Sequence, residues 1–347
     1  MKGVFSSYAK EQFREERWLA MVDSRSSRRE LDEYNAVADM EVLEDIILAY
    51  DVWIIHRLYL EFEPLIKKAK SRGVKVVIQT WGPDYMHVTA QYPLDVLLPK
   101  SKLWWEGYYS HSGLRKLYRE WIVWPRKAKR IRKVLSMADS VHFCLPSETT
   151  GVSGIHESPN CRFSYTPAPS DIISPSSTPS EDWVILGNSG DPTNNHLDAL
   201  HKLKERFVPV ERLLIPFSYA APAGYLETVH QEDVELFGAE RVEVLSDFLQ
   251  PDEYITKIAP FGTLMLYHKR QQAVGSFLLA LQQGKTILLH SEGKLNQWLL
   301  SDFGLDFGES KWGHTQGDDI TTNLISEYFS TARSERFIQL SRGIGES

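Results

Sequence analysis

Short apolar runs alternate with helical patterns through the first half of the chain. Val52–His56, Val74–Gln79 and Val141–Leu145 have the length and the β-branched content of buried strands. Phe62–Ser71 has helical spacing, and Gly73 follows as its C-terminal stop. A strand, a helix and a second strand at this spacing form a βαβ unit, so a parallel sheet is predicted.

The same alternation continues more regularly through the second half. Five strands are predicted, at Trp183–Leu186, Arg212–Ile215, Val242–Leu245, Thr263–Tyr267 and Thr286–His290. Helical patterns fall between them, at His196–Arg206, Tyr225–Leu236, Asp252–Ile258 and Ser276–Gln282. Repeated βα units of this kind predict a doubly wound α/β domain.

The chain has 347 residues, which exceeds the usual size of a single core. Its clearest seam is Thr166–Ser180, a stretch too rich in proline and serine to hold a core element. We therefore predict a first Rossmann-like domain over residues 1–165, a linker over 166–180 and a second Rossmann-like domain over 181–347. The last helix is a candidate to return to the first domain, and the two domains would face each other across a cleft.

Composition and charge narrow the class of protein. The formal net charge of −7 argues against a general nucleic-acid binder. No apolar run reaches the roughly 18 residues of a membrane span, and the N-terminus has no signal-peptide h-region. Cys144 and Cys161 form neither a disulfide framework nor a zinc cluster, and the histidines lack metal-ligand spacing. We expect a cytoplasmic, reduced protein without a bound metal.

A glycine turn follows the first strand of the second half. In open α/β sheets, ligands bind beyond the carboxyl ends of the strands, near helix N-termini. Bare backbone there lets an anion approach closely, and the side chains of Asn188, Ser189 and Thr193 can donate hydrogen bonds. We therefore predict anion-binding roles for Gly187, Asn188, Ser189, Gly190 and Asn194. A tight βα turn that binds nothing is the alternative, and the dinucleotide-binding G-x-G-x-x-G spacing is lacking.

A second polar cluster follows the strand at Thr263–Tyr267. Lys269, Arg270 and Gln271 precede Gly275 and Ser276, which begin an apolar helix. An arginine beside a helix N-terminus suits a diphosphate, since it adds bidentate donors to the positive end of the helix dipole. An ordinary surface charge or an ion pair is the alternative for Arg270.

Aromatic residues follow a third strand, in the stretch Ile215–Tyr219. Phe217 or Tyr219 could stack on a nucleobase, or both could serve in packing. Together the three strand ends predict a site for the pyrophosphate and base of a nucleotide.

These stretches resemble a known family. VILGNSGDPTNNH, LIPFSY, KRQQAVGS and the upstream TWGPDY are similar, in that order, to the bacterial TDP-N-acetylfucosamine:lipid II N-acetylfucosaminyltransferases, the 4-alpha-L-fucosyltransferase family. The resemblance runs from about Val52 to Leu300. It implies the GT-B fold and a metal-independent transfer of a 4-acetamido-4,6-dideoxyhexose from TDP to a polyprenyl-linked oligosaccharide. It also implies that 187–194 and 270–276 bind TDP.

The chain departs from the family pattern in two places. Ala273 stands where the family has glycine. The family begins with a strand and a loop before its first helix, whereas this chain opens almost directly on the helical stretch Ser6–Glu16. The first strand of the first domain is therefore expected to be missing or replaced.

Two residues of the first domain are candidates for catalysis. Inverting glycosyl transfer needs a base for the acceptor hydroxyl, whereas retention does not. Asp84, in the stretch Trp81–Asp84 after a predicted strand, is the preferred base, and His56 ends the preceding strand. The alternatives are a turn-forming carboxylate and a hydrogen-bonded core histidine.

A basic and aromatic segment stands out at 102–133. It carries ten Lys and Arg residues against two glutamates in a chain of net charge −7. Tryptophan, tyrosine and cations together suit the headgroups of an anionic bilayer. The predicted membrane or acceptor patch is Trp104, Trp105, Arg115, Lys116, Trp121, Trp124, Arg126, Lys127 and Arg130. Its alternative is an amphipathic helix whose aromatics pack inward.

The sequence thus predicts a GT-B glycosyltransferase that acts in surface polysaccharide assembly. Its substrates would be a TDP-sugar donor and a polyprenyl-linked or other glycan acceptor, with no further cofactor. Its place would be the cytoplasm, peripheral on the inner face of the plasma membrane. Two other hypotheses stay open: a non-catalytic nucleotide- or glycan-binding partner, and a GT-B sugar-nucleotide epimerase.

Overall fold

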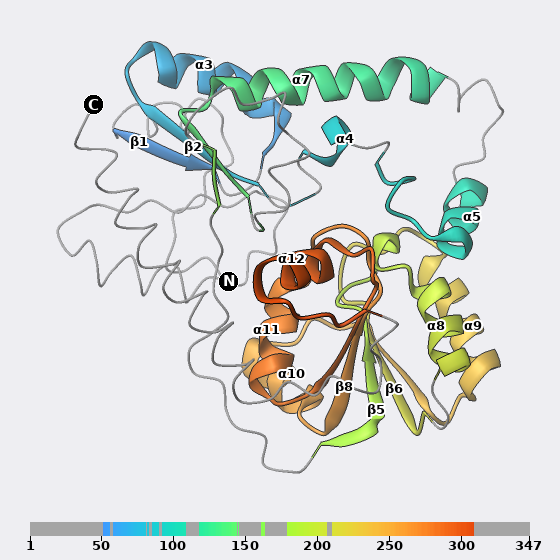
Figure 1. Ribbon diagram of the computed structural model, residues 1–347. Helices are drawn as coiled ribbons and strands as arrows, with labels where there is room; N and C mark the ends of the chain where they lie inside the picture. The colour runs from blue at the N-terminus through green and yellow to red at the C-terminus, as the bar shows by residue number, and fades with distance from the viewer. Residues whose placement is uncertain are drawn as a thin grey trace.

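The computed structural model describes residues 51–55, 58–80, 82, 85–89, 92–108, 118–143, 145, 161–163, 179–206 and 210–308 (Figure 1). These residues form two parallel sheets, one of four strands and one of five. Helices cover both sheets, so the α/β prediction with two sheets is confirmed. The described residues include neither the helical stretch at Ser6–Glu16 nor most of the linker. The prediction that the first strand is missing or replaced also concerns residues outside them.

The first sheet has its strands in chain order, β1 (Val52–Ile55), β2 (Lys75–Gln79), β3 (Ser140–Phe143) and β4 (Cys161–Phe163). All three pairings are parallel. The order of these four strands never reverses, so no topological switch point lies within them. The shorter elements of this region are η2 (Leu60–Phe62), α4 (Met86–Thr89) and the π-helical turn η3 (Arg119–Val123).

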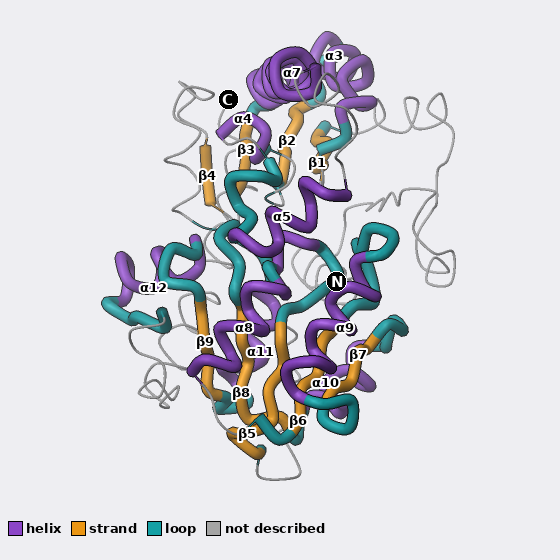
Figure 2. Tube along the Cα trace, turned by 90° about the vertical axis from the view of Figure 1, so that its right-hand side faces the viewer, coloured by secondary structure: helices purple, strands orange, loops and turns teal. Residues whose placement is uncertain are grey.

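Two helices pack on this sheet and on each other. α3 (Glu63–Ser71) and α7 (Trp124–Met137) lie side by side, on the side away from the second sheet (Figures 1 and 2). Their inner faces supply Ile66, Val134 and Leu135 to the core, all fully buried. Glu63 joins them, since its carboxylate accepts from Arg130 Nε at 3.0 Å and pairs with Lys133 Nζ at 2.8 Å.

The second sheet has the order β7-β6-β5-β8-β9, with all neighbours parallel. Its strands are β5 (Ser180–Leu186), β6 (Arg212–Pro216), β7 (Val242–Leu245), β8 (Phe261–Leu266) and β9 (Thr286–Leu289). The order runs outward from β5 in both directions, which is the doubly wound topology predicted. Each predicted strand is found within a few residues of its expected bounds.

Helices cover both faces of the second sheet. They are α8 (His196–Arg206), α9 (Tyr225–Phe237), α10 (Pro251–Ile258), α11 (Val274–Gln282) and α12 (Lys294–Phe303). α8 and α9 enclose one apolar core, and α10, α11 and α12 enclose a second on the opposite face (Figure 1). β5, β6, β8 and β9 each lead into a helix whose N-terminus lies near the strand's carboxyl end. These ends therefore collect free backbone donors at one edge of the sheet.

Helix α5 (Pro99–Tyr108) precedes the linker in the chain but packs against the second domain (Figures 1 and 2). The carboxylate of Asp198 in α8 accepts from the backbone N–H groups of Lys100 and Ser101, at 2.9 and 2.8 Å. Trp104 Nε1 donates to Thr228 Oγ1 at 3.0 Å. A segment from the first half of the sequence is thus fastened to the second domain, which a division at residue 166 does not anticipate.

Candidate functional site

The turn after β5 requires its two glycines for different reasons. Gly187 has φ +75, and a Cβ there would lie 3.0 Å from His196 Nε2. A Cβ on Gly190 would lie 2.6 Å from the Cβ of Ala221 and 2.8 Å from Cδ1 of Phe217. The turn is therefore packed directly onto the segment that follows β6, and only bare backbone fits between them.

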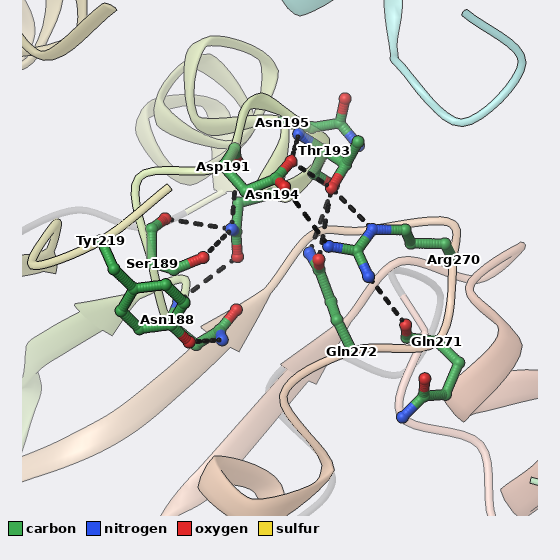
Figure 3. A network of polar contacts seen from close by, with 10 residues as sticks. All are labelled: Asn188, Ser189, Asp191, Thr193, Asn194, Asn195, Tyr219, Arg270, Gln271 and Gln272. Carbon is green, nitrogen blue, oxygen red and sulfur yellow. Dashed lines mark hydrogen bonds and ion pairs between the residues drawn. The ribbon is translucent and has the colours of Figure 1, made fainter. Parts of the chain in front are cut away.

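The residues after this turn form the short helix η5 (Pro192–Asn194), which organises the site (Figure 3). Asn194 accepts a hydrogen bond from the backbone N–H of Asn188 at 3.3 Å. Its Nδ2 donates to Ser189 O at 3.0 Å and to Ser189 Oγ at 3.1 Å. Both side chains, Asn194 and Ser189, are buried. They were predicted as ligand donors, but in the structure they bond each other and give the turn its shape.

Thr193 connects the same turn to the loop between β8 and α11. Its hydroxyl oxygen lies 2.7 Å from Arg270 Nε and 2.6 Å from Asp191 Oδ1. Gln272 Nε2 donates to the backbone oxygen of Thr193 at 3.3 Å. The predicted glycine turn and the predicted basic cluster are thereby brought together in one network (Figure 3).

Arg270 lies at the centre of this arrangement and is only 7% exposed. Besides the bond to Thr193, its Nη1 donates to Gln271 O at 3.1 Å, and its Nη2 lies 3.6 Å from Asp191 Oδ2. A guanidinium has five N–H groups. Three of them have no hydrogen-bond partner among the described residues, so Arg270 retains donors for an anion.

The start of α11 adds further donors next to Arg270. Ala273 precedes the helix with φ +59 and provides no side-chain cap. The N–H groups of the first helical turn have no partner within a helix. Gly275 is exposed and Ser276 half-buried, so this end is open to an anion. Lys269, beside Arg270, instead pairs with Glu292 at 3.0 Å.

The loop after β2 in the first domain reaches this cluster. A Cβ on Gly82 would lie 3.1 Å from Gln271 O and 3.5 Å from Arg270 Nη1. The structure therefore places the Gly82 backbone directly against the basic loop of the second domain. The predicted catalytic residues Asp84 and His56 lie outside the described residues.

The two candidate stacking residues differ in their surroundings. Phe217 is 4% exposed and packs on His196 and Tyr225, with ring centroids 5.0 and 5.8 Å apart. These contacts favour the packing alternative for Phe217, because its ring is used in the core. Tyr219 is 52% exposed, and its hydroxyl accepts from Asn188 Nδ2 at 3.2 Å, so its ring stays accessible.

Three histidines at this edge of the second domain are buried, His196, His268 and His290, and the first two have strongly lowered pKa values. His196 lies beneath the glycine turn and is fully buried, and burial lowers its pKa to about 3. His268, at the end of β8, is 1% exposed, and burial followed by the charge of Arg270 lowers its pKa to about 3. Both rings are therefore neutral near pH 7.

The predicted membrane patch separates into parts. Trp104 is half-buried and lies against Tyr225 with ring centroids 4.4 Å apart, so it helps to pack α5 on the second domain. Trp105 and Trp124 are half-buried, whereas Trp121 is 76% exposed. Arg126, Lys127 and Arg130 are exposed, although Lys127 contacts His87 Nε2 at 2.8 Å and Arg130 pairs with Glu63. Arg115 and Lys116 lie outside the described residues.

Asp191, which helps to shape the turn after β5, was not singled out from the sequence. Asp191, Thr193 and Asn195 stand within or beside the predicted turn, and Asp-Pro-Thr is a pattern that starts a helical turn, with Asp as cap and Pro in the first position. That pattern could have identified Asp191, whose Oδ1 accepts from Thr193 N at 2.9 Å. No local pattern indicates that Thr193 meets Arg270, which is 77 residues away.

The architecture is that of GT-B glycosyltransferases. One solved structure with this fold is HepE of Anabaena in complex with UDP, which is 12% identical with a TM-score of 0.56 and covers 87% of this chain and 81% of its own. A glycosyltransferase from Rickettsia africae is 11% identical with a TM-score of 0.55, covering 88% and 80%. Sucrose-phosphate synthase from Thermosynechococcus elongatus is 11% identical with a TM-score of 0.56, covering 89% and 80%.

The sequence of the chain is also similar to a protein family over part of its length. Residues 159–304 match the model of the family described as 4-alpha-L-fucosyltransferase, glycosyl transferase group 56. The match includes the glycine turn, η5 and the loop that carries Arg270. With the GT-B fold, it identifies the chain as a glycosyltransferase.

Proposed function

We propose that this glycosyltransferase uses a TDP-linked 4-acetamido-4,6-dideoxyhexose as its donor and transfers the sugar to a polyprenyl-linked or other glycan acceptor. The observation that carries the proposal is the position of Arg270, between the glycine turn and the open N-terminus of α11. Three of its N–H groups make no hydrogen bond to a described residue, although Nη2 lies 3.6 Å from Asp191 Oδ2. A guanidinium beside a helix N-terminus suits a diphosphate.

The comparisons support the donor class. HepE of Anabaena is described with UDP and with UDP-glucose, so a protein of similar fold binds a nucleoside diphosphate and its sugar. The family matched over 159–304 is described as fucosyltransferases, which favours a 6-deoxyhexose. The thymine base and the 4-acetamido group follow from the resemblance of the sequence motifs. We propose that the thymine ring stacks on the exposed side chain of Tyr219.

The reaction would then use positive groups of the protein instead of a cofactor. As the bond from the anomeric carbon to the diphosphate oxygen breaks, negative charge develops on the leaving TDP. Arg270 and the amide groups at the start of α11 would stabilise that charge. Lys269 would add little, because Glu292 pairs with it at 3.0 Å. Preorganised donors of this kind act without reorganisation at the moment of reaction.

An inverting reaction also needs a base for the acceptor hydroxyl, and we assign this role to Asp84. Its support is the contact made by Gly82 with the loop of Arg270. Asp84 is two residues further along the chain. His56 is the second candidate, since it directly follows β1, whose carboxyl end points to the same edge of the first sheet.

Calorimetric titration with TDP tests the donor site. Replacing Arg270 with Ala should weaken TDP binding by roughly 10- to 150-fold, the range for a lost hydrogen bond to a charged group. Arg241→Ala is the matched control, since this half-exposed arginine stands at the opposite end of β7 and should leave affinity unchanged. Wild-type affinity in folded Arg270→Ala protein would remove Arg270 from the site.

A transfer assay distinguishes a glycosyltransferase from the two alternative functions, a non-catalytic binding partner and an epimerase. With radiolabelled TDP-sugar and a polyprenyl-linked acceptor, only a transferase yields labelled lipid. A binding partner yields no product, and an epimerase converts the donor without acceptor.

We further propose peripheral attachment to an anionic bilayer. None of the helices in the described part of the chain is long and apolar enough to span a membrane. Five exposed apolar side chains, however, fall within residues 103–123, namely Leu103, Tyr108, Tyr118, Trp121 and Val123. The exposed cations Arg126 and Lys129 adjoin Trp121 in one shallow hollow. Each cation near an anionic surface contributes roughly 1 kcal/mol.

Co-sedimentation with vesicles of anionic phospholipid tests this attachment. Binding should fade as salt rises and should fall in Trp121→Ser. Phe248→Ser is the matched control, because Phe248 is 67% exposed on the second domain and should not affect binding. Absence of wild-type binding at low salt would contradict the proposal.

A further inference from the structure

The hydroxyl of Thr193 is a buried junction between two charged groups. Thr193 is 1% exposed. Its Oγ1 lies 2.7 Å from Arg270 Nε and 2.6 Å from Asp191 Oδ1. Arg270 has only donors and the carboxylate of Asp191 has only acceptors. An oxygen lone pair of the hydroxyl therefore accepts from Arg270. Its single proton points to Asp191, the nearer of two acceptors, since Gln272 Oε1 lies at 3.2 Å.

These contacts hold the guanidinium of Arg270 in one orientation. Thr193 binds the Nε edge, and Gln271 O binds Nη1 at 3.1 Å. Two bonds at separate corners of a rigid, planar fork fix both its position and its tilt. The remaining N–H groups then present a defined surface, as bidentate recognition of a phosphate requires.

Thr193 is itself held from both sides. Asp191 Oδ1 accepts from the backbone N–H of Thr193 at 2.9 Å, and Gln272 Nε2 donates to its backbone oxygen at 3.3 Å. The contact with Gln272 ties η5 to the same loop that carries Arg270. Figure 3 shows these side chains converging on Thr193.

We propose that Thr193 is a positioning residue for the donor diphosphate. It touches Arg270 and acts through it, by holding the guanidinium ready before the donor arrives. An arginine without this anchor would have to give up rotamer freedom on binding, and affinity would fall by that cost. The inference rests on the proposed role of Arg270 in diphosphate binding.

Calorimetric titration of the full chain with TDP tests the inference in a double-mutant cycle. Thr193→Val keeps the shape of the side chain and removes the hydroxyl, so TDP affinity should fall about tenfold. Thr193→Ser keeps the hydroxyl and should bind within about twofold of wild type. In an Arg270→Ala background, Thr193→Val should cause no further loss, because the two changes remove the same interaction. Thermal unfolding of each variant verifies that it is folded.

Each outcome of the cycle is decisive. Unchanged affinity in Thr193→Val, while Arg270→Ala binds weakly, overturns the positioning role and leaves the proposed function standing. An equal loss in the wild-type and Arg270→Ala backgrounds shows that Thr193 only supports the loop, and this also overturns the inference. Wild-type affinity in Arg270→Ala overturns the inference and the proposed donor site together. If Thr193→Val does not fold, a loss of affinity in folded Thr193→Ser equal to that of Arg270→Ala contradicts the proposal, and retained affinity supports it.

Discussion

The side-chain oxygen of Asn195 accepts a hydrogen bond from the backbone N–H of Leu98 at 2.8 Å. Its Nδ2 lies 3.2 Å from Val96 O and 3.2 Å from Tyr267 O. One fully buried amide thus joins the segment before α5 to the end of β8. Together with the hydrogen bonds that Asp198 accepts from the start of α5, it fastens this early segment to the second domain.

Removing this amide should destabilise the protein. Asn195→Ala would leave Leu98 N and two carbonyl groups without their partner, at a cost of about 2–4 kcal/mol. Asn195 also has φ +56, a conformation that disfavours alanine. Asn195→Gly is the control, because it removes the side chain without the backbone penalty. Urea unfolding measures both, and a loss below about 0.5 kcal/mol in the glycine variant would contradict the role of the amide.

The backbone conformation at Ala273 accounts for the glycine that the family pattern has at this position. Ala273 has φ +59, the left-handed region in which a residue with Cβ costs about 1–2 kcal/mol. Ala273→Gly removes that cost but restores about 0.4–1 kcal/mol of unfolded-state entropy. We expect a net stabilisation of up to about 1.6 kcal/mol by urea unfolding. Ala280→Gly, inside the same helix, should instead destabilise the protein, and stabilisation by both changes would refute this explanation.

Acid should destabilise the second domain through its buried histidines. The pKa of His196 is about 3 in the folded state, below the ordinary value of about 6.5 in the unfolded chain. Below pH 6.5 the unfolded chain therefore takes up a proton that the folded protein does not. This contribution is constant above pH 6.5 and costs about 1.4 kcal/mol per pH unit between 6.5 and 3.

Urea unfolding between pH 7.5 and 5 measures this dependence. His196→Gln should make the decline in stability below pH 6.5 shallower by about 1.4 kcal/mol per pH unit and leave the part from His268. Parallel curves for wild type and variant would show that His196 does not stay neutral in the folded protein.

Asp84→Asn tests the proposed base. The change removes the proton acceptor and keeps the size of the side chain. Turnover should fall at least about 100-fold, while TDP affinity stays at the wild-type value. Steady-state transfer and calorimetry measure the two effects separately. Near-normal turnover would point to retention or to a different base, and His56→Gln examines the second candidate in the same way.

Local pattern sufficed for much of the second domain. The alternation of apolar strands and helical stretches predicted β5 to β9 and the helices α8 to α11. This was possible because the spacing of apolar residues within each element depends only on neighbouring residues. Gly187, Gly190 and Arg270 were also predicted, since glycine and arginine at strand ends are local signals. For the same reason the segment 102–133 was recognised as basic and aromatic, but its partners were not.

Which residues meet across the chain was decided by the tertiary structure. Phe217 and Tyr219 are alike in sequence, yet packing against His196 and Tyr225 buries only the first. Trp104 belongs to a basic segment but lies on α9, because α5 docks on the second domain. Thr193 meets Arg270 only because β5 and β8 are neighbours in the sheet, so their carboxyl ends lie side by side. The sequence by itself determined the elements and the chemistry of their ends, and strand order determined which ends share a site.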